Sequence, residues 1–544
     1  MLNLEKRPAI YSKSHVLSAQ SRAPRKKITP PFAWRYITSS RTVIKNVNYG
    51  LEGVMQDDGK KYGILTLRRH CLNSQHIKSP HFTHTNLNKN TLTKGDSMST
   101  KNEPLGTESV HKLILKFGTF AVITMLATGA VNVISTLIIS RGIDIYAVGA
   151  IGILFPLVTV YFGFSQLISI GAASYISRML GKNKKEAVSR AIMISYALTL
   201  LISIALMICT WLGKDFILSF LGATGDYEEL ARTYLSIFIY SIPGAAMTLL
   251  SSAIFRAYGK LKLSMLVILV ESILIIGLDY LFIFGLQNGI GSVALSHILA
   301  GITASALGII LLIRLNGGLK ALKSSLKWDI SIIHGIASIG LSALGRSLAG
   351  AAFALVLNRT VNHLGGDNPI AALGTVNRII LFLLFTIMGI SQAMQPIVSY
   401  NFTAKNNDRV KSALKYALIY SGVIGIVGSI LGIFFPQQIV SIFTDNTDVL
   451  GDATLIFRMQ LVLFFTIGLQ TLSATYFQAI GKAWTSFFLS VFKPLLILIP
   501  LVYFMPKLLD DNISAVWWSF PISDTLATII CLLILWKGVR KLST

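Results

Sequence analysis

The sequence predicts an all-α integral membrane protein whose twelve transmembrane helices form two parallel six-helix repeats, an N and a C lobe, around a central cleft. Of its 544 residues, 53% are hydrophobic and only 13% are charged, and the mean hydropathy is +0.63. The apolar residues fall in blocks of roughly 20 to 27, the length of helix that crosses a bilayer. The second half of the chain also repeats the first in one register. Such a composition excludes a soluble enzyme or a nucleic-acid-binding domain for most of the chain.

Residues 1–97 differ from the rest of the chain. They carry 17 Lys and Arg against 5 Asp and Glu, a net charge of +12. They show no signal-peptide pattern, and their polar, basic composition predicts disorder. Met98 leads directly into the first apolar block, so we interpret it as the true start, with residues 1–97 as translated upstream sequence. The alternative is a basic arm that contacts anionic lipid or nucleic acid.

Twelve apolar blocks are long enough to cross a membrane. They lie at residues 113–139, 146–174, 190–212, 232–254, 263–286, 290–314, 331–357, 370–399, 413–434, 455–479, 484–505 and 514–537. An even division gives an N lobe of residues 98–318 and a C lobe of residues 319–544. Pro156, Pro243, Pro396 and Pro494 fall inside the blocks. Neighbouring helices or waters satisfy the backbone groups freed by such prolines, and the resulting kinks often line a cavity.

Charges in the loops predict the orientation, because Lys and Arg accumulate on the cytoplasmic side of membrane proteins. With the N-terminus inside, the basic inner segments are 178–190, 256–262, 314–327, 405–411 and 537–541. The outer loops are acidic, at Asp226–Glu229, Asp445–Asp452 and Asp510–Asp511. We therefore expect a multi-pass protein of the inner (cytoplasmic) membrane with both termini in the cytoplasm. This asymmetry explains the net charge of +25 without a nucleic-acid partner.

The two halves repeat at an offset of 222 residues. The offset places Phe255–Lys260 on Phe477–Lys482, and it also pairs Gly152 with Gly374, Ser169 with Ser391, Val188 with Val410, Ala191 with Ala413, Asp226 with Asp448 and Ser264 with Ser486. Because six spans separate the copies, both point the same way, as in parallel repeats related by an axis along the membrane normal. Two such lobes favour alternating access, in which they rock about one central site.

Ten stretches of the chain carry a resemblance to a known family. They are Gly149–Pro156, Ile170–Ser174, Leu180–Lys182, Phe255–Gly259, Leu278–Phe284, Gly389–Gln392, Gln395–Asn401, Ala404–Val410, Tyr476–Lys482 and Pro521–Asp524. From about Pro104 to its end, the sequence resembles the multidrug and toxic compound extrusion (MATE) family, in its branch of bacterial multidrug exporters. The resemblance implies the MATE fold and secondary active efflux. In such antiport, inward flow of Na+ or H+ drives export of amphipathic, often cationic, organic compounds.

Two positions depart from the family's usual cation-site pattern. This chain has Ser135 where the first helix most often carries Asp, and Ile275 where the fifth helix carries Asn. Asp279, the other acidic position of the pattern, remains. The resemblance therefore implies at most a weakened Na+ site near Asp279, and it favours H+ as the coupling ion. No further cofactor or metal is expected, and the three scattered cysteines indicate neither disulfides nor a metal site.

Asp279 is the strongest candidate for ion coupling, because a charge inside a span costs at least ~2.5 kcal/mol and needs a partner or a wet cavity. It falls in the outer half of the fifth span. Ser135 in the first span, and Ser296 and His297 in the sixth, are expected at a similar depth. The functional interpretation is that Asp279 takes up a proton as substrate is released, with His297 sharing the proton. The alternative is a capped, partly solvated Asp near the interface.

Glu271 and Lys493 occupy equivalent positions of the two repeats with opposite charges. One hypothesis is that they pair across the cleft in one conformation, or that each faces the cavity separately. The alternative is that each is satisfied within its own lobe.

The remaining intramembrane charges are Arg346, Arg378 and Asp524. A pair of Asp524 with either arginine would neutralise the interior of the C lobe. Three polar side chains, Asn132, Gln392 and Gln395, either line the cavity or form hydrogen bonds between helices.

Other function classes are disfavoured by missing motifs. The chain carries no G-x-x-x-x-G-K-[ST] nucleotide-binding motif, so ATP is not the expected energy source. The motifs of intramembrane proteases, prenyl transferases and lipases are also missing, and the chain is not expected to be an enzyme. A flippase of lipid-linked saccharides is the alternative, because Lys493, Arg346 and Arg378 could hold a pyrophosphate. The expected partners are small organic substrates and the bilayer, and the expected functional unit is a monomer.

Overall fold

The computed structural model describes residues 104–223, 225–316, 328–443, 447–509 and 512–542. The predictions for residues 1–97, for Met98 and for the lobe boundary at residues 318 and 319 lie outside the described residues, as do those for Asp445, Asp510 and Asp511. Within the described ranges all regular structure is helical. The predicted all-α class is therefore confirmed.

The N lobe begins with the short helix α1 and contains the first six spans. Its helices are α1 (Pro104–Thr107), α2 (Val110–Gly142), α3 (Ile145–Ile153), α4 (Phe155–Gly181), α5 (Lys185–Leu221), α6 (Asp226–Phe238), α7 (Ile242–Ala257), α8 (Leu261–Tyr280) and α9 (Gly291–Leu315). A short 3-10 turn, η5 (Ile239–Ser241), joins α6 to α7. A wide π turn, η6 (Leu281–Gly285), extends α8.

The C lobe contains the other six spans. Its elements are α11 (Ile330–Gly365), α12 (Asp367–Thr403), α13 (Asn407–Phe434), α14 (Pro436–Val440), α15 (Thr447–Leu461), α16 (Phe464–Ala479), α17 (Ala483–Val491), the π turn η7 (Phe492–Leu498), α18 (Ile499–Leu508) and α19 (Ile513–Arg540). Eleven helical segments of the described residues are long and apolar enough to cross a membrane. The pair Val449–Leu461 and Phe464–Ala479, bent by 50°, brings the number to twelve when its two parts are counted as one span.

The second span differs from its predicted bounds. The block from residue 146 is divided, because Asp144 caps a separate short helix, α3, by accepting a hydrogen bond from the Tyr146 backbone N–H at 3.5 Å. The spanning helix α4 starts at Phe155 and runs to Gly181, beyond the predicted end at residue 174. Pro156 lies in its first turn, where no backbone N–H is needed. Pro156 therefore begins a helix and does not kink one.

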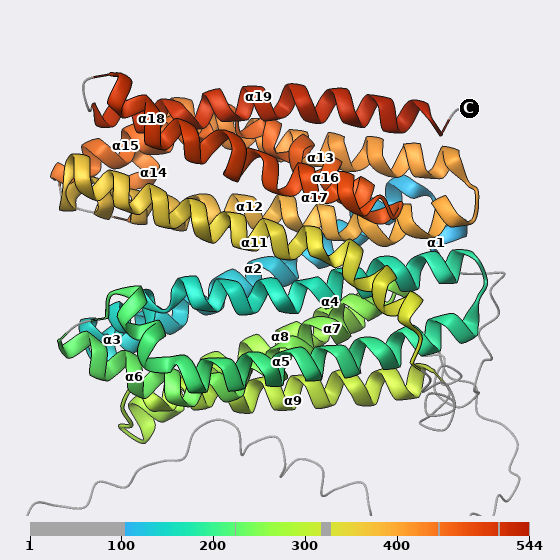
Figure 1. Ribbon diagram of the computed structural model, residues 1–544, viewed down its shortest axis with the longest axis horizontal. Coiled ribbons are helices and arrows are strands. Elements are labelled where there is room, and N and C mark those ends of the chain that lie inside the picture. The colour runs from blue at the N-terminus through green and yellow to red at the C-terminus, as the bar shows by residue number, and fades with distance from the viewer. Residues whose placement is uncertain (1–103, 224, 317–327, 444–446, 510–511, 543–544) are drawn as a thin grey trace, which may run out of the picture. The chain divides into compact units, whose positions relative to one another are not determined.

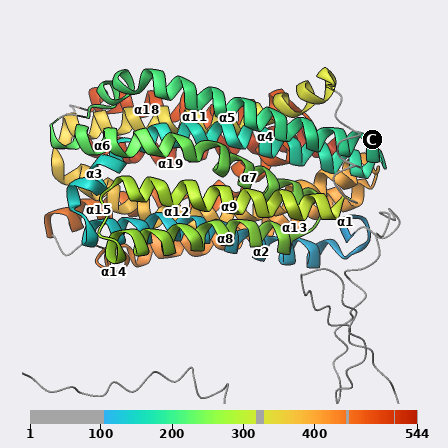
Figure 2. The same cartoon turned by 90° about the horizontal axis from the view of Figure 1, so that it is seen from below.

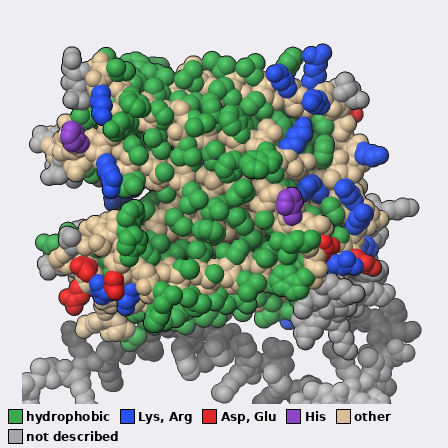
Figure 3. Space-filling model, in the orientation of Figure 1, with side chains coloured by type: hydrophobic (Ala, Val, Ile, Leu, Met, Phe, Trp, Pro, Cys, Tyr) green, Lys and Arg blue, Asp and Glu red, His purple; other side chains and the backbone are tan. Residues whose placement is uncertain are grey.

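The two lobes lie as two layers of helices that run along one common direction (Figures 1 and 2). They meet mainly where α11 packs along α4 and α12 packs along α2. The start of α2 and the end of α19 lie at the same end of the bundle (Figure 1). We call this the basic end, because Lys and Arg side chains gather there while apolar side chains cover the middle of the face (Figure 3).

The internal repeat reappears in the backbone. Asn183 and Lys405, 222 residues apart, both have a positive φ, of 58° and 62°. Gly259 and Gly481 repeat the match at 68° and 84°. After each of these glycines, the next N–H bonds to the carbonyl of the equivalent Phe at 2.8 Å. Both lobes therefore turn their second and fourth loops in the same way at the basic end.

Candidate functional site

A buried carboxylate lies where three helices of the N lobe meet. Asp279, near the end of α8, is 0% exposed. Ser135 of α2 donates a hydrogen bond from Oγ to Asp279 Oδ2 at 2.6 Å. Ser296 of α9 lies near the same carboxylate, and its own hydroxyl donates to the Ser292 carbonyl at 3.1 Å. Asp279 Oδ1 is buried and accepts no hydrogen bond from any described residue. The structure thus brings together Ser135, Asp279 and Ser296 from three different spans.

An apolar layer separates this carboxylate from the basic end. Val131, Ile275 and Ala300 lie one helical turn from Ser135, Asp279 and Ser296, respectively, and they form one buried cluster. Ile275 belongs to this layer, at the position where the family pattern carries Asn. A carboxylate that keeps one oxygen unbonded in such surroundings is costly, unless it takes up a proton or a cation. The arrangement therefore suits a group that changes its charge state during a cycle.

His297 lies next to Ser296 in the sequence but points elsewhere. Its ring packs edge-on against Phe238 of α6, with 5.5 Å between ring centroids. Within the described part of the chain, no hydrogen bond joins His297 to Asp279. The structure therefore does not place His297 as a direct proton partner of the carboxylate.

The C lobe contains an ion pair that differs from the predicted one. Lys493, in the wide turn η7, donates from Nζ to Asp524 Oδ1 of α19 at 2.5 Å. Gln470 of α16 donates to the same oxygen at 3.0 Å. The expected pairing of Asp524 with Arg346 or Arg378 is thus wrong for this conformation, because the wide turn brings Lys493 to α19.

Glu271 is not the partner of Lys493 in this structure. It lies on the face of α8 that carries Ile275 and Asp279, two turns from Asp279, and is partly exposed. No hydrogen bond or ion pair connects it with the other described residues. Lys493 is instead satisfied within its own lobe, as the alternative expected, but Glu271 has no such partner among the described residues.

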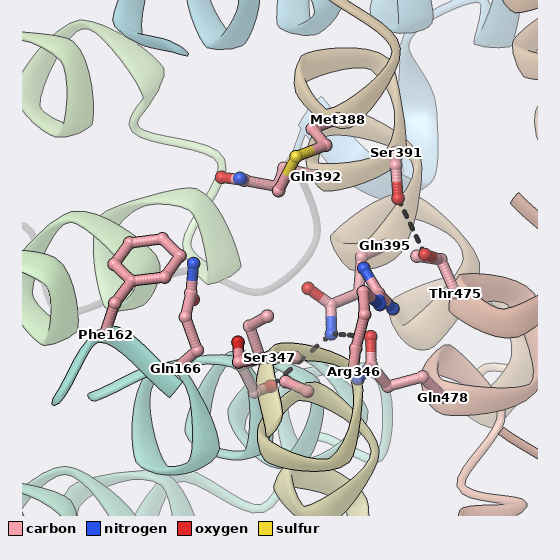
Figure 4. Close-up of a pocket in the computed structure, with 12 residues that line it drawn as sticks. Phe162, Gln166, Arg346, Ser347, Met388, Ser391, Gln392, Gln395, Thr475 and Gln478 are labelled. Atoms are coloured by element: carbon pink, nitrogen blue, oxygen red, sulfur yellow. Dashed lines mark hydrogen bonds between the residues drawn. The ribbon is translucent and has the colours of Figure 1, made fainter. Parts of the chain in front are cut away.

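A small polar cavity lies between the lobes (Figure 4). Its lining residues come from α4, α11, α12 and α16: Phe162, Gln166, Ile170, Ala343, Arg346, Ser347, Met388, Ser391, Gln392, Gln395, Thr475 and Gln478. The cavity has a volume of about 50 Å³, enough for a few water molecules, whereas pockets for drug-sized ligands measure about 300–1,000 Å³. In this conformation the cavity therefore excludes a whole organic substrate.

Three of the predicted cavity residues line this space, whereas Glu271, Lys493, Asp524, Asn132 and Arg378 do not. Arg346, Gln392 and Gln395 line it, and Gln392 also donates to Met125 Sδ at 3.4 Å across the lobe boundary. Asn132 is exposed on α2 and donates to the Thr128 carbonyl at 3.3 Å. Arg378 is exposed on α12. Neither Asn132 nor Arg378 is part of the cavity lining.

Two further glutamines, which the sequence analysis did not select, complete the cavity. Gln478 donates from Nε2 to Ser342 Oγ at 2.7 Å and accepts from Gln395 Nε2 at 3.5 Å. Gln166 of α4 is buried and faces the same space (Figure 4). Both are glutamines within apolar spans, as are Gln392 and Gln395. An amide side chain inside a membrane span therefore marked all four positions in the sequence.

Hydrogen bonds between the lobes concentrate near the basic end. Ser174 Oγ of α4 donates to the Gln478 carbonyl at 3.0 Å, and Thr403 Oγ1 of α12 donates to the Arg178 carbonyl at 2.9 Å. Arg409 of α13 donates to the carbonyls of Leu105 and Glu108 at 3.1 and 2.7 Å. At the opposite end the visible face is hollowed between the lobes (Figure 3). The lobes are thus closed at the basic end.

Twelve spans in two repeated lobes, with a buried carboxylate and a polar cavity between the lobes, define a polytopic protein built like a membrane transporter. The chain belongs to the MatE family, the MATE family of multidrug efflux transporters, whose profile matches residues 121–281 and 345–504. It is a MepA-like member of that family.

The curated relatives agree with this assignment in sequence, and the solved structures agree with it in fold. The multidrug export protein MepA of Staphylococcus aureus strain MSSA476 is 27% identical over 397 residues, 72% of this chain and 86% of the relative. The MepA of Staphylococcus saprophyticus is 25% identical over 430 residues, 79% and 94% of the two chains. An outward-facing multidrug resistance MATE transporter shares the fold with a TM-score of 0.77 at 21% identity, over 82% of this chain and 99% of the other. A MOP superfamily transporter from Pyrococcus furiosus has a TM-score of 0.76 at 21% identity, with the same coverage.

Proposed function

We propose that the protein exports amphipathic, often cationic, organic compounds by cation-coupled antiport, with Asp279 as the coupling residue. The observation that carries this proposal is the state of that carboxylate: fully buried, bonded to Ser135 through one oxygen and unbonded at the other. Membership of the MATE family and the export function of the MepA relatives support the same assignment.

We propose alternating access as the mechanism, with the basic end and both termini in the cytoplasm of a bacterium and the protein in the inner membrane. The positive charge at that end supports this orientation. Closure of the lobes there would make this the conformation open to the outside. Uptake of a cation at Asp279 from outside would then favour release of substrate and return of the lobes.

The residues around Asp279 fit a proton better than Na+. A proton needs a single carboxylate, whereas a bound metal cation needs several oxygen ligands at once. Ser135 and Ser296 supply only hydroxyls, and the apolar Ile275 lies where a further ligand would be expected. No group of three or more His, Cys, Asp or Glu suited to a metal occurs within the described residues. We therefore propose H+ as the coupling ion of a monomeric transporter.

Uptake of ethidium into everted vesicles, in which an exporter pumps inward, tests this proposal. A pH gradient and a Na+ gradient are imposed separately on the wild type and on Asp279→Asn. We expect export under the pH gradient, lost in Asp279→Asn and kept in Asp215→Asn, which removes an exposed carboxylate of the same lobe. Export that needs Na+ would overturn the choice of ion. Activity under neither gradient would overturn antiport and favour a flippase of lipid-linked saccharides.

The positions of three cationic side chains weaken the flippase alternative. It depended on a cavity rich in positive charge from Lys493, Arg346 and Arg378. Lys493 is neutralised by Asp524, and Arg378 lies outside the cavity lining. Arg346 remains the single cationic side chain among the residues that line the cavity. One guanidinium is a weak basis for holding a pyrophosphate.

A further inference from the structure

The cavity between the lobes carries an unbalanced positive charge. Arg346 is its charged lining residue, and its other lining side chains are amides, hydroxyls or apolar groups. No carboxylate is found among them. A pocket built to hold a simple cation would be expected to offer the opposite charge or an aromatic face to it. This cavity offers one aromatic ring, that of Phe162, and an arginine in place of the opposite charge.

One nitrogen of the Arg346 guanidinium, Nη2, has no acceptor among the residues that the structure describes. Arg346 lies near the middle of α11, about 24 Å from its start at the usual helical rise. Its Nη2 is buried, and none of the described residues accepts a hydrogen bond from it. A buried charged donor without an acceptor is costly, and a guanidinium presents its N–H groups in a planar fork that matches a carboxylate. The site is therefore suited to an acceptor brought by a ligand.

The neighbouring side chains are arranged to support such an acceptor. In Figure 4 the Arg346 guanidinium lies among Gln395, Thr475 and Gln478. Ser391 and Thr475 share a hydrogen bond of 2.6 Å, and Gln395 bonds to Gln478, so these groups are held in place. Gln166 approaches from the other lobe. The volume of about 50 Å³ fits a carboxylate with a water molecule, although it does not fit a whole drug.

We propose that Arg346 binds the carboxylate of zwitterionic or anionic amphipathic substrates, with the amides of both lobes around it. This inference rests on the proposed export function and narrows its substrate class. The head group occupies the present cavity, and the rest of the substrate enters the space that opens when the lobes separate. Substrates that are only cationic bind without help from Arg346.

A matched pair of dyes tests the proposal. One is a rhodamine with a free benzoate carboxylate, the acid dye, and the other is its methyl ester, the ester dye. Binding to the purified protein in detergent micelles is measured by fluorescence anisotropy. We expect Arg346→Gln to weaken binding of the acid dye roughly ten-fold or more, because the two charge-assisted hydrogen bonds from the guanidinium to the carboxylate are lost. Binding of the ester dye should change less than about two-fold. Arg359→Gln, an exposed arginine on the same helix, serves as the control and leaves both affinities unchanged.

Two further measurements keep the outcome clear. If Arg346→Gln folds poorly, Arg346→Lys is measured in its place. The lysine keeps the positive charge but lacks the planar fork, so this variant should keep part of the wild-type affinity for the acid dye. In the wild type alone, the acid dye should bind several-fold more tightly than its ester. Equal affinities of wild type and Arg346→Gln for the acid dye, or tighter binding of the ester by the wild type, would overturn the inference. The proposed function is tested separately by export of the ester dye under a pH gradient, because this dye has no free carboxylate. If the ester dye is exported, the proposed function holds even when the inference about Arg346 fails.

Discussion

The two lobes share a backbone plan but handle an intramembrane carboxylate in opposite ways. Their loops at the basic end repeat the same positive φ angles at matching positions. In the N lobe, Asp279 has a serine partner and, among the described residues, no cationic side chain paired with it. In the C lobe, Asp524 is held by Lys493 and Gln470. The repeat therefore conserves the turns that set the fold, while the carboxylate chemistry differs: one lobe keeps a carboxylate able to change charge, and the other locks its carboxylate in an ion pair.

The largest effect is expected from breaking the C-lobe pair. Lys493→Met leaves Asp524, whose side chain is 4% exposed, without its counter-charge. Removing one partner of a buried ion pair costs about 3–5 kcal/mol. We expect a clear loss of thermal stability in detergent micelles, measured by unfolding monitored with tryptophan fluorescence.

The double variant Lys493→Met with Asp524→Asn is the control for that experiment. It removes both charges and keeps an acceptor for Gln470. We expect most of the lost stability to return, because replacing both members of a buried pair is often close to neutral. A double variant as unstable as Lys493→Met would show that the lysine stem, and not the charge pair, holds the C lobe together.

Asp279→Asn should give the opposite pattern. It removes a buried charge that no cation balances, so stability is expected to stay level or to rise by about 1 kcal/mol. Transport driven by a pH gradient should fall by roughly two orders of magnitude or more, because a neutral amide cannot take up the coupling proton. Thermal unfolding and vesicle efflux are measured on the same preparations. A large loss of stability would place Asp279 in the same structural class as Asp524 and remove the contrast between the lobes.

Arg409 tests whether the contacts between the lobes at the basic end act as a latch. Its guanidinium bonds two carbonyls at the start of the N lobe and Asn401 Oδ1 in its own lobe. Hydrogen bonds of a charged group contribute about 1.5–3 kcal/mol. Arg409→Gln should therefore let the lobes separate more often at this end. We expect maleimide to label a cysteine introduced at Ser174, which is buried in the interface, several-fold faster.

The labelling experiment needs a background without other reactive cysteines. Cys71 and Cys209 are therefore replaced by serine, whereas Cys531 is kept because it is buried. Lys415→Gln, which removes an exposed charge further along α13, is the matched control and should not change the labelling rate. An unchanged rate in Arg409→Gln would show that the other contacts between the lobes keep this end closed without Arg409.

Most of the fold could be predicted because span length and loop charge are local properties of the sequence. Apolar blocks of bilayer length determine the twelve spans. The depth of Ser135, Asp279 and Ser296 follows from counting residues along three spans, which is why their meeting could be expected. The division of the second block into α3 and α4 was not predicted, because both parts are apolar and only the cap at Asp144 and the position of Pro156 mark the break.

The side-chain partners were harder to predict, because a membrane helix is apolar on most of its surface and hydropathy does not determine its rotation. His297 is adjacent to Ser296 in the sequence but faces Phe238. Asp524 was expected to pair with an arginine, and the wide turn η7 instead presents Lys493 to it. A π turn changes the rotation of the helix that follows it about its axis. The Lys493-Pro494 pair within an apolar block is a weak sequence indication of where this turn lies.

The smallest effect is expected from the hydroxyl that supports Asp279. Ser135→Ala removes one hydrogen bond of 2.6 Å to the carboxylate but keeps the carboxylate itself. A hydrogen bond to a charged group contributes about 1.5–3 kcal/mol at most, and less when a proton neutralises that group for part of the cycle. We expect efflux under a pH gradient to fall several-fold without being lost. Thr136→Ala, whose hydroxyl bonds only the Asn132 carbonyl of its own helix at 2.7 Å, is the matched control. If Ser135→Ala abolished transport as completely as Asp279→Asn, the serine would be an essential member of the coupling site, and the N lobe would depend on a bonded pair just as the C lobe does.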